Sequence, residues 1–458
     1  MKLVIKNVEV YDPQNHIEGE VRNIYIQDGL ISKPFKKPDK EIDGAGFWAL
    51  PGGIETGTQL ATYGLSFYGL KENFPGPSEI SRQYAAMGYT HLHESMMFPT
   101  TAQGIHHYLS SLPYQDTSAS LCLTLREFGT LIGSNIPPEW TVRFFATCAH
   151  RFRALNIRLP ETSAHFKESN LARYNILAQR VIDYLSQFSL KFPLLIELTS
   201  RLLDEDLPQI PHLYYSHIGR AIDGEYAFKQ VSNLIANKGI IGDIGLAPQE
   251  SHSQLKIEAE IGEGEDLSAH VGMHSPLRYL KVPPKSQSDF VTTLATHTDF
   301  KRHLAFSSLC LGAQAKTFYP EIFKRLFETD TSYTISDFVH QTRVLPAILL
   351  GLENKGHLGI GAQGDVALYK SDDGLPLGEA LSRCHTLIKS GVPIMEGGEL
   401  LDPPPEPIKK TYFRSHTPSE RDFAMFAGYF KSYPRIEHLD VPEALGEWEV
   451  ISLPENNG

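Results

Sequence analysis

The sequence predicts an α/β protein in which a parallel barrel is flanked by strand-rich segments. Residues 51–350 alternate short apolar runs with longer helical patterns, as expected for a parallel sheet covered by helices. A segment of about 300 residues suits an eight-stranded (β/α) barrel. Residues 1–50 and 351–400 read as strands separated by glycine-containing turns. Residues 401–458 open with a proline-rich extended segment and form a C-terminal extension.

The N-terminal segment carries a clear hairpin signal. Asp28-Gly29 separates the alternating apolar pair Ile24 and Ile26 from Leu30-Ile31. An Asp-Gly pair between alternating apolar residues favours a two-residue turn that joins antiparallel strands. We therefore expect a β-hairpin here.

The barrel segment begins with one helix and one strand that can be placed from spacing. Ile80, Tyr84 and Met87 follow the i, i+4, i+7 pattern of a helix face, and Gly88 predicts the end of that helix. Residues 89–94 then alternate like a strand. Further short apolar runs at residues 192–198, 213–218 and 239–244 predict additional strands, bounded by turns or helical stretches.

Composition narrows the possible partners and compartment. The 458-residue chain has a net charge of −12, which gives a nucleic-acid-binding surface no global support. Apolar runs stay shorter than 18 residues, so no membrane span is expected. The four cysteines are far apart, and residues 1–30 hold no signal-peptide core. We expect a cytoplasmic protein.

Residues 50–59, with the sequence LPGGIETGTQ, resemble the first barrel strand of amidohydrolase-superfamily enzymes. In that family a His-x-His pair at the end of this strand binds a divalent metal, because side chains two apart share one strand face. Here the two positions hold Gly57 and Gln59. Glycine offers no ligand, and an amide is a poor ligand for a zinc-like ion.

Three further segments resemble one subfamily, the A-type subunits of formylmethanofuran dehydrogenase and of the bacterial formyltransferase/hydrolase complex. They are residues 87–99, the Phe318-Tyr319-Pro320 segment and the block 333–362, which is the closest match. The resemblance implies an amidohydrolase-type (β/α)8 barrel. It also implies a small β-sandwich formed by the N- and C-terminal segments.

The same resemblance implies that further catalytic positions are replaced. Asn156 stands where the family has a metal-bridging, carboxylated lysine. Leu309 stands where an aspartate activates water, as counted back from Tyr319-Pro320. Apolar residues of the run 193–198 occupy the next histidine positions. A chain that has lost two histidines, the bridge and the base lacks the parts of a binuclear centre.

A few residues could still serve a rearranged site. His91 and His93 share a strand face, and either His212 or His217 could be a retained family histidine. We treat these four as metal candidates, although hydrogen-bonded polar residues are the simpler interpretation. Glu197 ends a predicted barrel strand and is the carboxylate most worth following as a ligand-binding candidate.

Three functions remain open at this level. The leading hypothesis is a catalytically degenerate A-type subunit, without cofactor, that serves as a scaffold or regulatory partner for other subunits of a formyltransferase/hydrolase-type complex in one-carbon metabolism. The second is an active zinc-dependent hydrolase of formyl C–N bonds with a rearranged metal site. The third is a module that binds a methylofuran-type formyl carrier without hydrolysing it, which rests on fold analogy alone.

An aromatic stripe in the extension could serve the scaffold role. Phe426, Tyr429, Phe430 and Tyr433 fall on one face of a predicted helix, with Phe423 nearby. Such a face packs either on a partner protein or on the chain's own barrel. Both alternatives stay open in the sequence.

Overall fold

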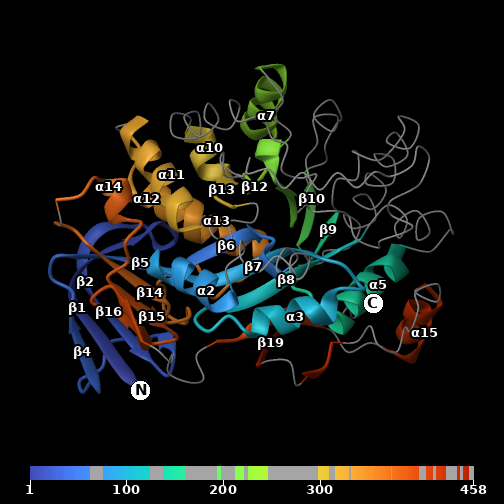
Figure 1. Ribbon diagram of the computed structural model, residues 1–458, viewed down its shortest axis with the longest axis horizontal. Helices are drawn as coiled ribbons and strands as arrows, with labels where there is room; N and C mark the ends of the chain where they lie inside the picture. The colour runs from blue at the N-terminus through green and yellow to red at the C-terminus, as the bar shows by residue number, and fades with distance from the viewer. Residues whose placement is uncertain are drawn as a thin grey trace.

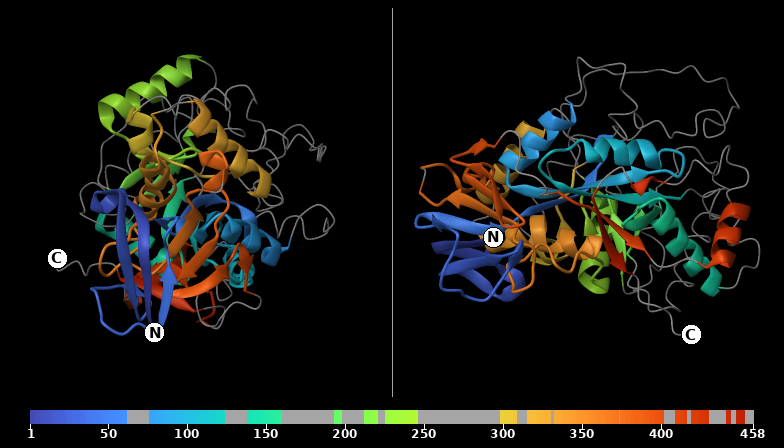
Figure 2. Two further views of the ribbon diagram at one scale, coloured as in Figure 1. Left: turned by 90° about the vertical axis from the view of Figure 1, so that its left-hand side faces the viewer. Right: turned by 90° about the horizontal axis from the view of Figure 1, so that it is seen from below.

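The computed structural model arranges the chain as two β-sheets, one mixed and one parallel, with the helices packed mainly around the parallel sheet (Figure 1). The structure describes residues 1–61, 76–123, 138–159, 193–197, 212–220, 225–245, 298–308, 315–329, 332–372, 374–401, 409–415, 419–429, 441–443 and 447–452. The mixed sheet lies beside the barrel at one end of the molecule (Figure 2). This two-part α/β plan confirms the predicted fold class.

The mixed sheet joins the two strand-rich segments. Its path runs β17-β16-β15-β14-β5-β1-β2-β3, and β4 pairs with β1. Alternating apolar residues such as Leu3, Ile5 and Ile26 bury one face of it together with Val366 and Ile388. The strands are β1 (Lys2–Asp12), β2 (Ile17–Gln27), β3 (Leu30–Ile31), β4 (Lys40–Asp43), β5 (Phe47–Pro51), β14 (Val366–Lys370), β15 (Thr386–Lys389), β16 (Val392–Glu396) and β17 (Glu399–Leu400).

The predicted hairpin is confirmed. β2 and β3 pair antiparallel, with Gln27 opposite Leu30. Asp28 and Gly29 both have positive φ, of 52° and 83°. That backbone matches the twist of two-residue hairpins, and an Asp-Gly pair adopts it more readily than most residue pairs.

The parallel sheet forms the barrel wall. Eight described strands pair in chain order from β6 to β13, and the sheet curls so that its two edges approach each other (Figure 1). These strands are β6 (Gly53–Thr58), β7 (Tyr89–Met97), β8 (Asp116–Cys122), β9 (Asn156–Leu159), β10 (Leu194–Glu197), β11 (Leu213–Ser216), β12 (Gly242–Asp243) and β13 (Leu304–Ala305).

Helices cover this sheet as crossover connections do in a (β/α) barrel. The predicted helix at residues 80–87 is confirmed as α2, whose residues Ile80 and Tyr84 are buried. The helices as far as α11 are α2 (Pro77–Ala86), α3 (Ala102–Ser110), α5 (Pro138–Arg151), α7 (Glu225–Lys238), α10 (Thr298–His303) and α11 (Ala315–Thr329). After β13 and α11 follow α12 (Ile335–Val339), the π-helical turn η8 (His340–Val344), α13 (Leu345–Leu350) and α14 (Leu377–Ala380).

The two sheets are connected directly through Gly52, between β5 and β6. A Cβ atom at Gly52 would lie 2.2 Å from Oγ1 of Thr90, so only glycine fits. Buried Arg343 reinforces this junction. Its Nε donates to the Pro51 carbonyl at 3.3 Å, and its Nη2 donates to the Tyr369 hydroxyl at 2.9 Å.

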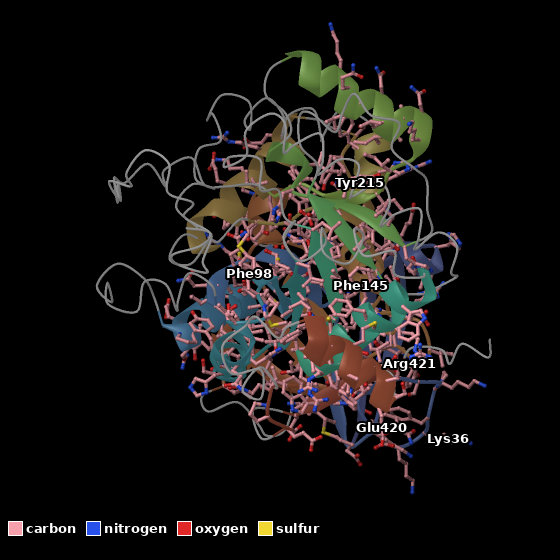
Figure 3. The ribbon with its side chains drawn as sticks, turned by 90° about the vertical axis from the view of Figure 1, so that its right-hand side faces the viewer. Lys36, Phe98, Phe145, Tyr215, Glu420 and Arg421 are labelled. Atoms are coloured by element: carbon pink, nitrogen blue, oxygen red, sulfur yellow. The ribbon has the colours of Figure 1, made fainter. Side chains whose placement is uncertain are left out.

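The C-terminal extension contributes to the barrel sheet. β18 (Thr411–Ser415) runs parallel to the first half of β8, and β19 (Trp448–Ser452) runs parallel to β18. Between them lies α15 (Glu420–Tyr429), which begins with Glu420 and Arg421 on the outer surface (Figure 3).

The aromatic stripe of this extension packs inward where it is described. Phe426 is buried, with its ring 5.6 Å from the Phe152 ring and 6.4 Å from the Phe144 ring. The interface alternative is therefore wrong for Phe426, because α5 and the adjoining Phe152 already cover it. Phe430 and Tyr433, and the side chain of Tyr429, lie outside the described part of the chain.

No helix in the described part of the chain is long and apolar enough to cross a membrane.

Candidate functional site

The end of β6 has no room for a side chain at Gly57, the first of the two predicted replaced positions. Gly57 is buried, and a Cβ atom placed there would lie 2.8 Å from the Ser307 Cβ and 2.9 Å from the Ser308 carbonyl oxygen. Both distances are shorter than real Cβ contacts. The segment after β13 thus occupies the space into which a histidine at Gly57 would project.

Gln59, the second replaced position, is also fully buried. Neither its Nε2 nor its Oε1 has a hydrogen-bond partner in the described part of the chain. The side chain is polar, buried and unsatisfied, which is uncommon away from functional or water-filled sites.

Glu55 on β6 bridges the two edges of the curled sheet. Its carboxylate accepts hydrogen bonds from the backbone N–H groups of Gly57 and Ser308, both at 3.0 Å, from the Ser308 hydroxyl at 3.2 Å, and from the Tyr319 hydroxyl. Burial raises the pKa of Glu55 to about 7, although these donors oppose the shift. Sequence reasoning noted this acid only as part of a motif.

A chain of hydrogen bonds runs along the barrel wall through three neighbouring strands, from β7 through β8 to β9. His91 Nε2 lies 2.8 Å from the Ser118 Oγ, which lies 2.7 Å from His93 Nδ1. His93 Nε2 lies 2.7 Å from the Ser120 Oγ, and Ser120 donates to the Asn156 Oδ1. Serines two apart on β8 thus match histidines two apart on β7, because both pairs face inward.

This chain permits one consistent arrangement of protons. Burial lowers the pKa of both His91 and His93 well below the usual value, so both rings are neutral at pH 7. Ser120 donates to Asn156 and therefore accepts from His93 Nε2–H. His93 Nδ1 then accepts from Ser118, which accepts from His91 Nε2–H. Both nitrogens of His93 are occupied, and neither offers a lone pair to a metal.

Asn156, at the start of β9, takes part in this chain through its carbonyl only. It is fully buried, and its Nδ2 has no acceptor among the residues that the structure describes. The assignment of Asn156 to the position of a bridging lysine stays a prediction; the structure places this residue in the buried interior. An amide cannot form the carbamate that bridges two metals.

A buried ion pair that sequence reasoning missed extends from the same strand, β9, toward β12 (Gly242–Asp243). Arg158 on β9 is fully buried, and its Nη2 lies 3.8 Å from the Asp243 Oδ2. Arg158 Nη1 lies 3.0 Å from the His217 Nε2. Asp243 Oδ1 accepts from the Ser307 hydroxyl at 2.7 Å and from the backbone N–H of His217 at 3.0 Å.

The remaining candidates do not gather into one site. His212 precedes β11 and His217 follows it, so the two lie at opposite ends of one strand. Glu197 ends β10 beside Ser216, but its side chain lies outside the described part of the structure, as does Leu309 altogether. Among the described residues, no group of three or more His, Cys, Asp or Glu side chains could hold a metal ion.

The described donors therefore do not fit the metal centre that this fold carries elsewhere. Gly57 lacks both a side chain and the room for one, and Asn156 cannot supply a bridging anion. A guanidinium group stands beside His217 and Asp243, where it would repel a divalent cation.

A second buried polar cluster lies at the opposite ends of the barrel strands, against the mixed sheet. We call Asp116, Lys355, Asp365 and Lys389 the basal cluster. The two ammonium groups lie 2.7 Å from the Asp116 carboxylate and 3.0 to 3.1 Å from the Asp365 carboxylate. Burial alone would raise the pKa of both acids, but the two lysines outweigh it and hold both pKa values below the usual range.

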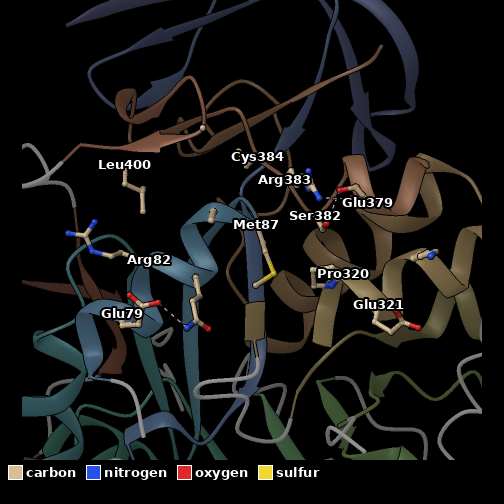
Figure 4. Close-up of a pocket in the computed structure, with 14 residues that line it drawn as sticks. Glu79, Arg82, Met87, Pro320, Glu321, Glu379, Ser382, Arg383, Cys384 and Leu400 are labelled. Atoms are coloured by element: carbon tan, nitrogen blue, oxygen red, sulfur yellow. Dashed lines mark hydrogen bonds and ion pairs between the residues drawn. The ribbon is translucent and has the colours of Figure 1, made fainter. Parts of the chain in front are cut away.

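A cleft of about 910 Å³ opens on the outside of the barrel, between α2, α11 and the segment after α14 (Figure 4). Its charged walls include the internally paired Glu379 and Arg383. Cys384 also lines it, and burial raises the pKa of this thiol to about 12, so the thiol is unreactive at neutral pH. The cleft is separate from the barrel interior.

Comparison with solved structures identifies the class of fold. The chain superposes on a structure of the formyltransferase/hydrolase complex FhcABCD from Methylorubrum extorquens, with methylofuran bound, at a TM-score of 0.77, 18% identity and coverage of 99% of this chain and 100% of that one. It also matches a β-aspartyl dipeptidase from Fervidobacterium islandicum at a TM-score of 0.54 and 13% identity, covering 88% and 99%. A D-hydantoinase matches at 0.52 and 11% identity, covering 87% and 96%. The protein has the amidohydrolase fold.

Sequence comparison gives a narrower relationship. No family model matches the chain. Protein FwdA of Methanocaldococcus jannaschii is 32% identical over 139 residues, which are 26% of this chain and 24% of FwdA. The A-type subunit of the Fhc complex of M. extorquens is 40% identical over 72 residues, 16% of this chain and 13% of that protein. The chain is therefore related to these two proteins, and the aligned segments span a quarter or less of their length.

Proposed function

We propose that this protein is a catalytically degenerate A-type subunit that serves as a scaffold or regulatory partner within a formyltransferase/hydrolase-type assembly. The main observation is the closure at Gly57, where the Ser307 and Ser308 segment fills the space of a metal ligand. A chance loss of one ligand would leave that space open. Here the neighbouring segment packs into that space, and Glu55 holds the segment in place by accepting hydrogen bonds from Ser308.

The shared architecture supports a role that depends on shape. The interior of the barrel differs from a metal centre, yet the overall match to a chain of the FhcABCD structure extends over 99% of this chain. A barrel's core and its strand-end chemistry are separable, so the fold can persist as a protein surface after the chemistry is lost.

Metal analysis tests the part of the proposal that concerns catalytic degeneracy. We expect the purified, dialysed chain to hold less than roughly 0.2 zinc per molecule, because too few ligands remain for a zinc site. One or two zinc ions per chain, together with hydrolysis of a formamide substrate, would instead establish the active-hydrolase alternative.

Affinity purification from the native host tests the scaffold half. A tagged full-length chain is expected to retain formyltransferase-type subunits in fixed ratio. Exposed charged residues on the barrel helices, such as Arg325 and Glu321 on α11, can be substituted while the core stays intact. Recovery of the chain as a sole monodisperse species would contradict a scaffold role.

A further inference from the structure

Within the described part of the chain, one edge of the buried Arg158 guanidinium makes no hydrogen bond. Its Nη1 contacts the His217 ring, whereas Nε and Nη2 have no hydrogen-bond partner among the described residues. Nε and Nη2 form the edge of the planar group that binds a carboxylate-type ligand through two parallel hydrogen bonds. A cation with that edge unoccupied, inside a barrel, is a preformed half of an anion site.

Two neighbouring side chains complete the set of unsatisfied groups. Asn156 lies two residues before Arg158 on β9 and therefore shares its face, and its Nδ2 meets no acceptor in the described ranges. Across from them, the Asp243 Oδ2 meets no donor there and lies 3.8 Å from the Arg158 Nη2, beyond hydrogen-bond distance. All three residues are fully buried.

These atoms specify the shape and chemistry of a ligand. Three donors require acceptor oxygens, and one carboxylate oxygen requires an O–H donor. We propose that Arg158, Asn156 and Asp243 bind a small planar oxyanion that bears a hydroxyl group, of which bicarbonate is the simplest. Its two unprotonated oxygens would meet the Arg158 edge, and its hydroxyl would donate to Asp243. The positive charge of Arg158 offsets the negative charge of Asp243 in this site.

This site does not depend on the scaffold role and goes beyond it, because none of its interactions involves another protein. It also uses no metal. The proposal and the proposed function therefore fail separately: zinc content and partner recovery test one, and anion binding by the isolated chain tests the other.

The experiment titrates the full-length chain in carbonate-free buffer with sodium bicarbonate, and with nitrate, formate, acetate and chloride at matched ionic strength. Thermal unfolding and isothermal calorimetry are the readouts. We expect saturable stabilisation by bicarbonate and none by chloride. Nitrate has the same planar shape without the hydroxyl, so it should bind about tenfold more weakly, the ratio expected for one charge-assisted hydrogen bond. Acetate tests whether the site accepts the carboxylate of a larger molecule.

Variants assign the binding to these residues. Arg158→Gln should abolish the bicarbonate effect, and Arg158→Lys, which keeps the charge but not the planar edge, should retain only weak binding. Because either change could unfold a buried site, Asn156→Asp serves as the second variant. It keeps Arg158 and replaces a donor with a negative charge, so it should also lose bicarbonate binding. Asp243→Asn should remove the preference for bicarbonate over nitrate.

The absence of saturable binding up to roughly 50 mM bicarbonate, which corresponds to an interaction too weak to be specific, would overturn the proposal. So would equal binding by the wild type and a folded Arg158→Gln or Asn156→Asp variant. In either case, water alone satisfies these polar atoms.

Discussion

The two buried polar clusters of this barrel differ in how completely their charges are satisfied. In the basal cluster, Asp116 accepts from Lys355, Lys389 and the backbone of Lys410, and Asp365 accepts from both lysines and from the Ser390 backbone. In the interior near the strand ends, Arg158, Asp243, Asn156 and Gln59 each keep an atom that finds no partner within the described part of the chain.

The difference separates a structural cluster from a candidate binding site. A buried charge network that is fully paired fixes the relative position of the elements that carry it. One that keeps unsatisfied donors and acceptors is destabilising unless water or a ligand completes it. The basal cluster joins the barrel to the mixed sheet, whereas the interior cluster retains the capacity to bind.

The largest expected effect comes from breaking the basal cluster. Lys389→Met leaves two buried carboxylates with a single ammonium group, and removing one member of a buried ion pair typically costs about 3–5 kcal/mol. Urea unfolding should show this loss. Lys410→Met is the control, because its ion pair with Glu449 is exposed and should contribute less than about 1 kcal/mol. Similar losses in both variants would show that the basal cluster is not specially stabilising.

The next effect is a pH dependence set by Glu55. The folded pKa of about 7 lies above the usual 4.5, so the folded state holds a proton that the unfolded state has released between these values. Its contribution to stability is complete below pH 4.5 and is lost as the pH rises to about 7, by about 3 kcal/mol. Glu55→Gln cannot titrate and should lack this slope. Parallel stability profiles for the two proteins across this pH range would disprove the assignment.

A smaller loss is expected at the closed metal position. Gly57→Ala places a Cβ within 2.9 Å of the Ser308 carbonyl and should cost about 1–3 kcal/mol by overpacking. Gly428→Ala in α15 is the control, since no described atom lies within 4 Å of a Cβ there and alanine is favoured over glycine inside a helix. Thermal unfolding distinguishes them. If Gly57→Ala were as stable as the wild type, the space would be open and the closure argument would fail.

The smallest effect concerns the hydrogen-bond chain between His91 and Asn156. Ser118→Ala removes one hydroxyl that contacts both histidines, at a cost of about 1 kcal/mol per bond. Nitrogen NMR of the wild type should show neutral, Nε2-protonated His91 and His93, and the variant should alter both resonances. A charged imidazole at pH 7 in the wild type would contradict the proton arrangement.

The sequence by itself determined the local elements. The hairpin at Asp28-Gly29 and the helix at Ile80 and Tyr84 follow from patterns over a few residues. At that range, backbone preferences and the spacing of buried apolar residues set the secondary structure directly. The sequence also predicted replaced ligand positions at Gly57 and Asn156 through a resemblance to a known family, and both residues are buried.

Only the tertiary structure decided which distant charges meet. Lys389 and Asp116 are 273 residues apart in sequence, yet they form a buried ion pair. Arg158 reaches Asp243 across the interior, and Phe426 packs under the barrel helices instead of forming an interface. Charged residues follow no periodic pattern in the sequence from which their ion-pair partners could be identified. Their pairing is fixed when the strand ends converge in the folded barrel, because burial in a low-dielectric interior makes an unpaired charge costly.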